Sequence, residues 1–281
     1  METGYRYGLQ SDPLSCGCTV STQTVEPDFH LHNTFEIYFL LSGNVVFLIE
    51  NKRWQLKAGD LVLLNNRQVH KSINPSGEVY RRFVIHFDPQ LLYGFGTGRE
   101  EEKSLLLSRF LEQADRSPII HLESAAFDSI RARFEAMQQA LLDGSIQGRI
   151  KAHAYLVLLL CELEPVQNTQ PLEIRQDGFS GDVMDYLQAH LSEPFSLDAL
   201  SETFMVNKHH LCRRFKAETG GTVYRYLLLK RIAVAQSCLL QGESVQTACE
   251  TAGFGDYANF IRCFKKHVGL SPGQYQKRFG H

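Results

Sequence analysis

The pattern of apolar and polar residues changes character near the middle of the chain. In the first third, short runs of β-branched and aromatic residues are separated by turn signals such as Ser42-Gly43-Asn44 and Lys57-Ala58-Gly59-Asp60. The strands predicted between Thr19 and Asp88 are Phe35–Leu41, Val45–Glu50, Trp54–Leu56, Leu61–Leu64 and Tyr80–Phe87. Many short strands at close spacing predict a sandwich or a barrel.

From Ser124 onwards the apolar residues recur every three or four positions, which predicts helices. We expect one helix over Ser124–Leu142 and a second from about Ile146 to Leu163. The second is too apolar to be exposed all round, so it packs beneath the barrel, pairs with a second subunit, or does both. The polar segment Glu164–Gly178, which has two prolines and no clear periodicity, is predicted to be an interdomain linker.

The last third contains one motif twice, SLDALSETFMVNKHHLCRRFKAETG at Ser196–Gly220 and SVQTACETAGFGDYANFIRCFKKHVG at Ser244–Gly269. With a one-residue insertion in the second turn, the copies align as a short helix, a tight turn and a second helix rich in cations. That is the shape of a helix-turn-helix, whose second helix can lie in the major groove of DNA. Asn207 and Asp256 are expected to cap the two recognition helices, and a long helix over Thr222–Leu240 would set the distance between the units.

The distribution of charge and the number of cysteines limit the class of protein further. The net charge is −2, but residues 177–281 carry 12 Lys and Arg against 10 Asp and Glu, whereas residues 1–176 carry 17 against 21. The seven cysteines form no Cys-x-x-Cys pair, which argues against a disulfide framework or a zinc finger. The first residues, METGYRYGLQSDP, lack the pattern of a signal peptide, and no apolar run is long enough to span a bilayer, so we expect a cytoplasmic protein.

A group of histidines in the barrel region indicates its chemistry. His30 and His32 are followed by Glu36, and His70 comes further on. Residues two apart on a strand point the same way, so His30 and His32 are expected to converge on one interior site. Three imidazoles and a carboxylate suit a transition metal, but the same groups can also line a metal-free pocket for a small organic ligand.

The spacing His-x-His-x3-Glu-x6-Gly, followed by Gly59, His70 and Asn74, resembles the two motifs of cupin barrels. It departs from them at Thr24, Asn65 and Arg67, which replace two glycines and a proline. The resemblance implies that these side chains lie inside a barrel, where we expect a ligand-binding pocket with no cofactor, and the alternative is one divalent metal held by His30, His32, Glu36 and His70. The candidate effector-binding residues are His30, His32, Glu36, Tyr38, His70 and His86.

Residues 180–279 resemble the DNA-binding domain of the AraC/XylS family of bacterial transcription regulators. The resemblance rests on the first helix-turn-helix sequence, on the segment YLLLKRIAVAQSCLL and on ACETAGFGDYANFIRCFKKHVGLSPGQY. It departs at Phe204-Met205, where a smaller residue and a glycine are commoner, and at Cys249, where alanine is frequent. Many members of the family place a cupin-like sensor, often for a sugar, before the paired motifs and dimerise through the helices after it.

The resemblance carries the family's base-reading positions onto the two recognition helices. These positions are His209, Cys212, Arg213, Tyr257, Ala258, Asn259, Ile261 and Arg262. Arg213 and Arg262 would each read guanine and Asn259 would read adenine, unless the two arginines form surface salt bridges instead. Phosphate contacts are expected from Lys208, Lys216, Lys265 and Lys266.

Together these features predict an α+β multidomain protein. The expected parts are a cupin-like barrel over residues 1–122, a helical dimerisation segment over 123–164, a linker over 165–179 and a double helix-turn-helix domain over 180–281. We expect a homodimeric, effector-controlled regulator that binds double-stranded DNA, contacts RNA polymerase as an activator and has no enzyme activity. The alternatives are a metal-binding cupin with a DNA-binding tail, acting as a sensor or an enzyme, and a constitutive DNA-binding protein whose barrel is a dimerisation scaffold.

Overall fold

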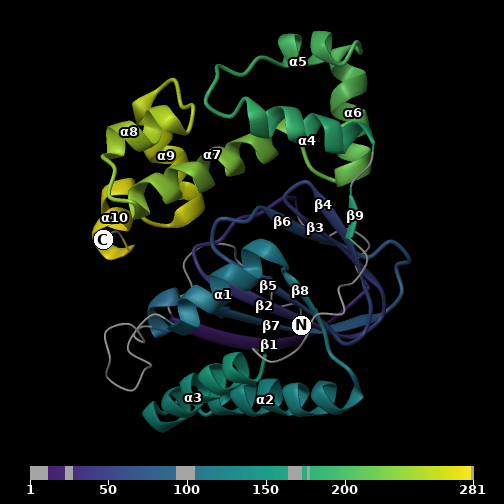
Figure 1. Cartoon of the computed structure of the whole chain (residues 1–281), viewed down its shortest axis with the longest axis vertical. Coiled ribbons are helices and arrows are strands. Elements are labelled where there is room, and N and C mark those ends of the chain that lie inside the picture. The colour runs from purple at the N-terminus through teal and green to yellow at the C-terminus, as the bar shows by residue number, and fades with distance from the viewer. Residues whose placement is uncertain (1–11, 23–27, 93–104, 164–172, 176–177, 280–281) are drawn as a thin grey trace.

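The computed structural model describes residues 12–22, 28–92, 105–163, 173–175 and 178–279. Within them the chain forms a β-barrel, a helical hairpin beneath it and an all-helical domain above it (Figure 1). The predicted α+β architecture, with strands first and paired helix-turn-helix units last, is therefore confirmed.

Two antiparallel sheets enclose the core of the barrel. One has the strand order β1-β7-β2-β5-β8 and the other has the order β6-β3-β4-β9. The strands are β1 Leu14–Ser21, β2 Phe35–Ser42, β3 Val45–Ile49, β4 Lys52–Leu56, β5 Asp60–Leu64, β6 His70–Ile73, β7 Tyr80–Phe87, β8 Ile119–His121 and β9 Glu173–Arg175. All five predicted strands are present. The structure also contains β1, β6, β8 and β9, which were not predicted. β9 forms inside the predicted linker and pairs with β4, while the rest of that linker up to residue 177 lies outside the described residues.

The helical hairpin covers the outer face of the larger sheet. The helical elements of this half are η1 Pro89–Leu92, α1 Leu105–Arg116, α2 Ser124–Leu142 and α3 Ile146–Leu163. The hairpin, α2 and α3, has the predicted bounds, and the Phe134 ring of α2 lies 5.3 Å from the rings of both Phe39 and Phe83. Packing beneath the barrel, one of the two expected roles, is thus confirmed. The far side of the hairpin still exposes large apolar side chains, namely Leu142, Ile146, Ile150 and Leu158.

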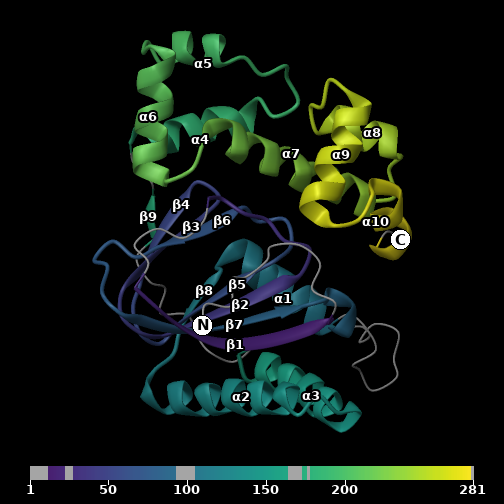
Figure 2. The ribbon, with the colours of Figure 1, turned by 180° about the vertical axis from the view of Figure 1, so that it is seen from behind.

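The second half of the described chain is helical apart from its turns. Its helices are α4 Phe179–Ala189, α5 Leu197–Thr203, α6 Lys208–Thr219, α7 Val223–Leu240, α8 Val245–Thr251, α9 Tyr257–Val268 and α10 Pro272–Phe279. The 18 residues of α7 span about 27 Å, with α5 and α6 at one end and α8 and α9 at the other (Figure 2). Among the helices of the described residues, none combines the length and apolar character needed to cross a bilayer.

The helical domain is docked on the outer face of the smaller sheet, as both views show. All five residues of β3 are buried because their side chains alternate between two cores. Val45 and Phe47 belong to the interior of the barrel, whereas Val46 and Leu48 join the core of the helical domain. One strand therefore serves both domains.

Polar contacts tie both ends of the helical domain to the barrel. Asn51 of the barrel bonds Asp185 of α4, which precedes the first helix-turn-helix unit. Asp88 accepts a hydrogen bond of 2.5 Å from Arg278 of α10, which follows the second unit. The same barrel thus holds both units in place.

Candidate functional site

Each recognition helix begins at a side-chain cap that the sequence predicts. The Asn207 side chain accepts a hydrogen bond from the His210 N–H at 2.8 Å, and the Asp256 carboxylate accepts one from the Asn259 N–H at 2.5 Å. The caps satisfy N–H groups that have no partner within the helix, and so they fix where α6 and α9 start.

The turns of the two units share one backbone requirement. Gly253 has a φ of 78°, and Met205, which aligns with it in the first unit, has a φ of 50°. This left-handed region favours glycine because a Cβ crowds the backbone there. The departure from the family pattern at Met205 therefore leaves a strained residue in the first turn, with a side chain that is 92% exposed.

The recognition helices bury one face and leave the candidate base-reading residues on the others. Leu211 and Phe215 of α6, and Phe260 and Phe264 of α9, are fully buried. The exposed candidates are His209, Arg213, Tyr257, Ala258, Asn259 and Arg262, and the half-buried ones are Cys212 and Ile261. The two half-buried side chains also pack against the domain core, so they contribute to stability as well as to the surface.

In the described part of the chain, the two candidate guanine-reading arginines lie close to an imidazole ring and to an amide group. Arg213 lies 3.5 Å from the His210 ring, and Arg262 lies 3.4 Å from the amide oxygen of Asn259. Within the described part of the chain neither is paired with a carboxylate, whereas the neighbouring Arg214 bonds Glu218 at 2.8 Å. The surface salt bridge considered from the sequence is therefore not formed there.

The candidate phosphate contacts differ in their surroundings. Lys208 is paired with Asp198 at 2.7 Å, so DNA would have to compete for it. Lys216, Lys265 and Lys266 are exposed. Among the described residues none of these three lysines has an ion-pair partner, so they fit a phosphate-binding role.

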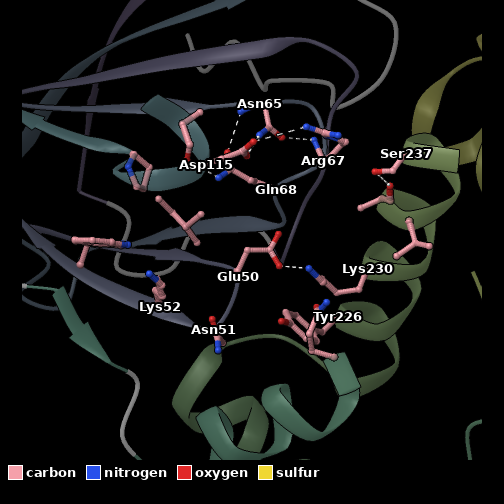
Figure 3. A pocket seen from close by; sticks show the side chains of 17 residues that line it. Glu50, Asn51, Lys52, Asn65, Arg67, Gln68, Asp115, Tyr226, Lys230 and Ser237 are labelled. Carbon is pink, nitrogen blue, oxygen red and sulfur yellow. Dashed lines mark hydrogen bonds and ion pairs between the residues drawn. The ribbon is translucent and has the colours of Figure 1, made fainter. Parts of the chain in front are cut away.

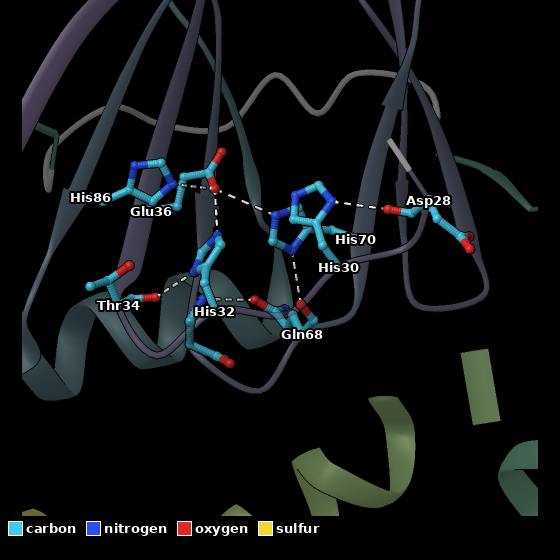
Figure 4. Close-up of polar contacts among 9 residues, drawn as sticks. Asp28, His30, His32, Thr34, Glu36, Gln68, His70 and His86 are labelled. Atoms are coloured by element: carbon cyan, nitrogen blue, oxygen red, sulfur yellow. Dashed lines mark hydrogen bonds and ion pairs between the residues drawn. The ribbon is translucent and has the colours of Figure 1, made fainter. Parts of the chain in front are cut away.

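A second polar site lies inside the barrel, and we name it the histidine cluster: His30, His32, Glu36, His70 and His86 (Figure 4). The Glu36 Oε2 atom lies 2.7 Å from His32 Nε2, 3.4 Å from His70 Nε2 and 3.2 Å from His86 Nε2. His30 packs edge-on against His70, with ring centroids 4.2 Å apart. Five of the six candidate effector-binding residues are thus brought together.

Tyr38, the sixth candidate, lies one aromatic ring away from the cluster. Its ring packs 5.1 Å from Phe47, and Phe47 in turn stacks 6.0 Å from His70. Tyr38 is buried in the barrel core, where it can form a wall of the site.

The route by which His30 and His32 converge differs from the prediction. They do not lie in a continuous strand, because His30 pairs with His70 as an isolated bridge through backbone hydrogen bonds of 3.2 and 3.1 Å. The alternation persists nonetheless. His30 and His32 belong to the cluster, while Phe29 and Leu31 are buried in the core of the helical domain.

The surroundings of the cluster set its charge. Burial, followed by neighbouring imidazoles, holds the pKa of His30 well below its ordinary value, and burial lowers the pKa of His86. Burial alone would raise the pKa of Glu36, but hydrogen bonds from His32, His70 and His86 outweigh it and hold that pKa well below its ordinary value. At neutral pH the cluster therefore contains a carboxylate anion, with His30 and His86 neutral.

A cavity of about 440 Å³ lies between the two domains (Figure 3). The barrel contributes Glu50 and Arg67 to its wall, α7 contributes Tyr226 and Lys230, and an ion pair between Glu50 and Lys230 crosses it. The sequence does not reveal this site, because its walls come from two domains. The available signal was Lys230 itself, a lysine within the apolar run LLLKRIAVA, since buried lysines are rare unless paired.

Comparison with known proteins assigns the class. The AraC-like ligand binding domain matches residues 13–152 and the helix-turn-helix domain matches residues 200–278, so the chain belongs to the AraC family of transcription regulators. It is 24% identical over 262 residues to the uncharacterized HTH-type transcriptional regulator YdiP of Escherichia coli K12, covering 90% of this chain and 82% of YdiP.

Two further similarities are to a curated relative and to a solved structure. The HTH-type transcriptional activator RhaR of Klebsiella pneumoniae is 22% identical over 252 residues, covering 89% of this chain and 87% of RhaR. Among solved structures, the DNA-binding domain of AdpA in complex with a target DNA is 24% identical with a TM-score of 0.34, covering 36% of this chain and 91% of that one. The curated relatives are regulators, so the chain is a transcription regulator and not an enzyme.

Proposed function

We propose that an effector bound at the histidine cluster controls how the helical domain is held against the barrel, and thereby controls DNA binding. The observation that carries this proposal is the segment of residues 29–32. Its side chains alternate between the cluster, with His30 and His32, and the core of the helical domain, with Phe29 and Leu31. Phe29 packs edge-on against Tyr226 of α7 at 5.3 Å. A ligand that moves the histidines therefore also moves the contact with α7.

A second link joins the cluster to the same helix. Val69, the residue before His70, donates its N–H to Glu50 at 2.9 Å, and Glu50 forms the ion pair with Lys230. Glu50 is the first residue of the two-residue turn that joins β3 to β4, and its φ of 57° is the left-handed conformation that such a hairpin turn uses. The turn thus presents the Glu50 side chain to Val69 and Lys230.

Docking supports control of the two DNA-reading units together, because the barrel is tied to α4 and to α10. An effector with different affinities for the docked and released arrangements shifts their ratio. In the DNA-binding arrangement, α6 and α9 enter major-groove segments about 34–36 Å apart. Arg213 and Arg262 then read guanine and Asn259 reads adenine.

The exposed apolar face of the hairpin supports a homodimer. Leu142, Ile146 and Ile150 are 73%, 65% and 64% exposed, and clustered apolar side chains of this kind mark interaction surfaces. RhaR is named a transcriptional activator. We therefore propose a cytoplasmic dimer that activates transcription through contact with RNA polymerase.

The effector class that the family resemblance favours is a sugar. Its hydroxyl groups would exchange hydrogen bonds with the imidazoles and with Glu36, and Tyr38 would line the far side. Loss of the effector response in the Glu36→Ala variant, with operator affinity retained, would separate this regulator from a constitutive DNA-binding protein.

Selection of bound sequences from random DNA with the full-length protein tests the DNA-reading assignment. Arg213→Ala and Arg262→Ala should each weaken binding to the selected operator by about 1–3 kcal/mol and relax the preference at one base pair. Arg214→Ala is the matched control, since Arg214 is engaged with Glu218 and lies over the Phe179 ring. Unchanged operator affinity in both test variants would refute the assignment of α6 and α9 as the base-reading helices.

A further inference from the structure

The cavity between the barrel and α7, drawn in Figure 3, has a buried hydrogen-bond donor on its wall. Trp54 of β4 lines this cavity and is only 2% exposed. Among the residues that the structure describes, none accepts a hydrogen bond from its indole Nε1–H. A buried donor without an acceptor is destabilising, so an acceptor atom of a bound molecule would be favourable here.

The two carboxylates on the wall of the cavity already accept hydrogen bonds. Glu50 accepts one from Lys230 and another, of 2.9 Å, from the Val69 N–H. Asp115 accepts one of 2.7 Å from the side-chain amide of Asn65. The strongest acceptors of the wall are therefore engaged within the protein.

The cations on the wall, by contrast, have donors to spare. The Arg67 guanidinium has five N–H donors, and it lies 3.9 Å from Asp115, which is longer than a hydrogen bond. The Lys230 ammonium has three donors, and Glu50 takes one of them. Together with Lys52, these residues place three cations on the wall against two carboxylates. The sign of the charge and the surplus of donors both favour a bound anion.

We propose that this interdomain cavity is a second ligand site, which binds a small polar organic carboxylate through Arg67, Lys230 and the Trp54 N–H. The site uses different side chains from the histidine cluster, and it does not depend on the function proposed for that cluster. Its volume of about 440 Å³ lies in the range of about 300–1,000 Å³ that is usual for small-molecule sites. Arginine and lysine form charge-assisted hydrogen bonds with carboxylates, which are stronger than neutral ones.

The rest of the wall favours a ligand with hydroxyl groups over one with a hydrocarbon tail. Most of the lining residues are polar or charged, and Asn51, Asn65 and Gln68 add amide groups. A hydrocarbon chain would cover these groups without giving them hydrogen-bond partners, which is unfavourable. Hydroxyl groups both donate and accept, so they can pair with amides. The ligand class is therefore a hydroxy acid.

A ligand at this site would strengthen docking. Trp54 and Arg67 belong to the barrel, whereas Lys230 belongs to α7, so the three donors come together only in the docked arrangement. A ligand that binds one arrangement more tightly shifts the equilibrium toward it. This regulatory consequence rests on the proposed control of DNA binding by docking, whereas the site itself does not.

The test uses intrinsic fluorescence, because Trp54 is the only tryptophan of the chain and lines the cavity. The full-length protein is titrated with a size series of hydroxy acids, namely gluconate, threonate and lactate. Each is compared with the polyol in which a CH2OH group replaces the carboxylate, and octanoate represents acids with a hydrocarbon tail. We expect at least one hydroxy acid to change the Trp54 emission saturably, and at a lower concentration than its polyol or octanoate.

Two variants check the position of the bound acid. Arg67→Gln should weaken its binding by about 10-fold or more, because it removes a hydrogen bond to a charged group. Arg53→Gln is the matched control and should leave the affinity unchanged, since Arg53 is an exposed residue of the same strand as Trp54 and does not line the cavity. Thermal unfolding checks that both variants are folded.

Several results would overturn the site or its class of ligand. If none of the three hydroxy acids changes the Trp54 emission at millimolar concentration, or if the polyols bind as tightly as the acids, the cavity is not a carboxylate site. Equal affinity in Arg67→Gln and the unaltered protein would place the acid elsewhere. Tighter binding of octanoate would replace the hydroxy acid with a hydrocarbon acid.

Hydrogen exchange tests the effect on docking separately. The bound acid should slow exchange in residues 28–33 and in α7, and unchanged exchange would overturn the effect on docking while leaving the site in place. Neither measurement depends on an effector at the histidine cluster. Failure of this proposal would therefore leave the proposed function standing, and failure of the proposed function would leave the site standing.

Discussion

Gly221 allows a direct test of docking. It lies between α6 and α7, and a Cβ at this position would sit 2.4 Å from Asp28 Oδ1 and 2.5 and 2.9 Å from two ring carbons of Phe29. Both neighbours belong to the barrel domain. The φ of Gly221 is outside the left-handed region, so alanine fits the local backbone. Gly221→Ala should therefore push the domains apart without disturbing the DNA-binding domain itself.

The size of the effect follows from which neighbour can move. The Asp28 side chain can rotate away, but the Phe29 ring is fully buried and packs against Tyr226. Overpacking of this kind costs about 1–3 kcal/mol. The ratio of docked to released molecules should therefore fall by about 5- to 150-fold.

Hydrogen exchange of the full-length protein measures this change. Gly221→Ala should speed exchange in residues 28–33 and in the part of α7 that faces them, while α6 and α9 keep their protection. Gly273→Ala is the matched control, because Gly273 is an exposed helical glycine with no atom within 4 Å of the added carbon. Unchanged exchange in residues 28–33 and α7 would refute the reasoning. Loss of protection throughout the helical domain would also refute it, because the clash would then act within that domain.

Three other substitutions test separate parts of the account. Met205→Gly should stabilise the protein by about 1 kcal/mol in urea unfolding, because it relieves the left-handed strain that Gly253 avoids in the second unit, and a loss of stability would contradict that explanation. Ile150→Asp should shift the dimer to monomer in sedimentation without lowering the melting temperature, since this side chain is 64% exposed, and an unchanged dimer would exclude this face. Lys265→Ala should reduce the salt slope of operator binding by about 1. Lys277→Ala, on α10, is the control. If Lys265→Ala and the unaltered protein have equal salt slopes, Lys265 does not contact a phosphate.

Local signals explain how much of the fold was predictable. Asn207 and Asp256 mark helix starts through their own side-chain geometry, and the helical periodicity of Ser124–Leu142 depends only on neighbours along the chain. The paired motif is likewise local, so both units lie where the sequence places them. Strands rich in β-branched and aromatic residues could be predicted from the sequence. β9, by contrast, is three residues of a polar segment and forms through its pairing with β4.

The remainder depends on contacts between segments far apart in sequence. The run Val45–Ile49 predicts a buried strand, but nothing in it says that its outer face is covered by another domain. The cupin spacing does not include His86, and only the pairing of β2 with β7 brings it opposite Glu36. The cavity beside Lys230 has the same origin, since its walls come together only when the domains dock.

The free energy of docking limits which effectors can shift the equilibrium between the docked and released arrangements. Moving an equilibrium from 1:99 to 99:1 requires a ligand that binds one state about 10⁴-fold more tightly, or about 5.5 kcal/mol. A ligand held by a few neutral hydrogen bonds, each worth about 0.5–1.5 kcal/mol net, would have to lose nearly all of them in the other state. The buried Phe29 contact and the Glu50–Lys230 ion pair make docking firm, so an effector has to bind the docked and released arrangements with clearly different affinities. Gly221→Ala, which weakens docking, should therefore shift the effector concentration at which operator affinity changes, and an unchanged concentration would separate docking from the effector response.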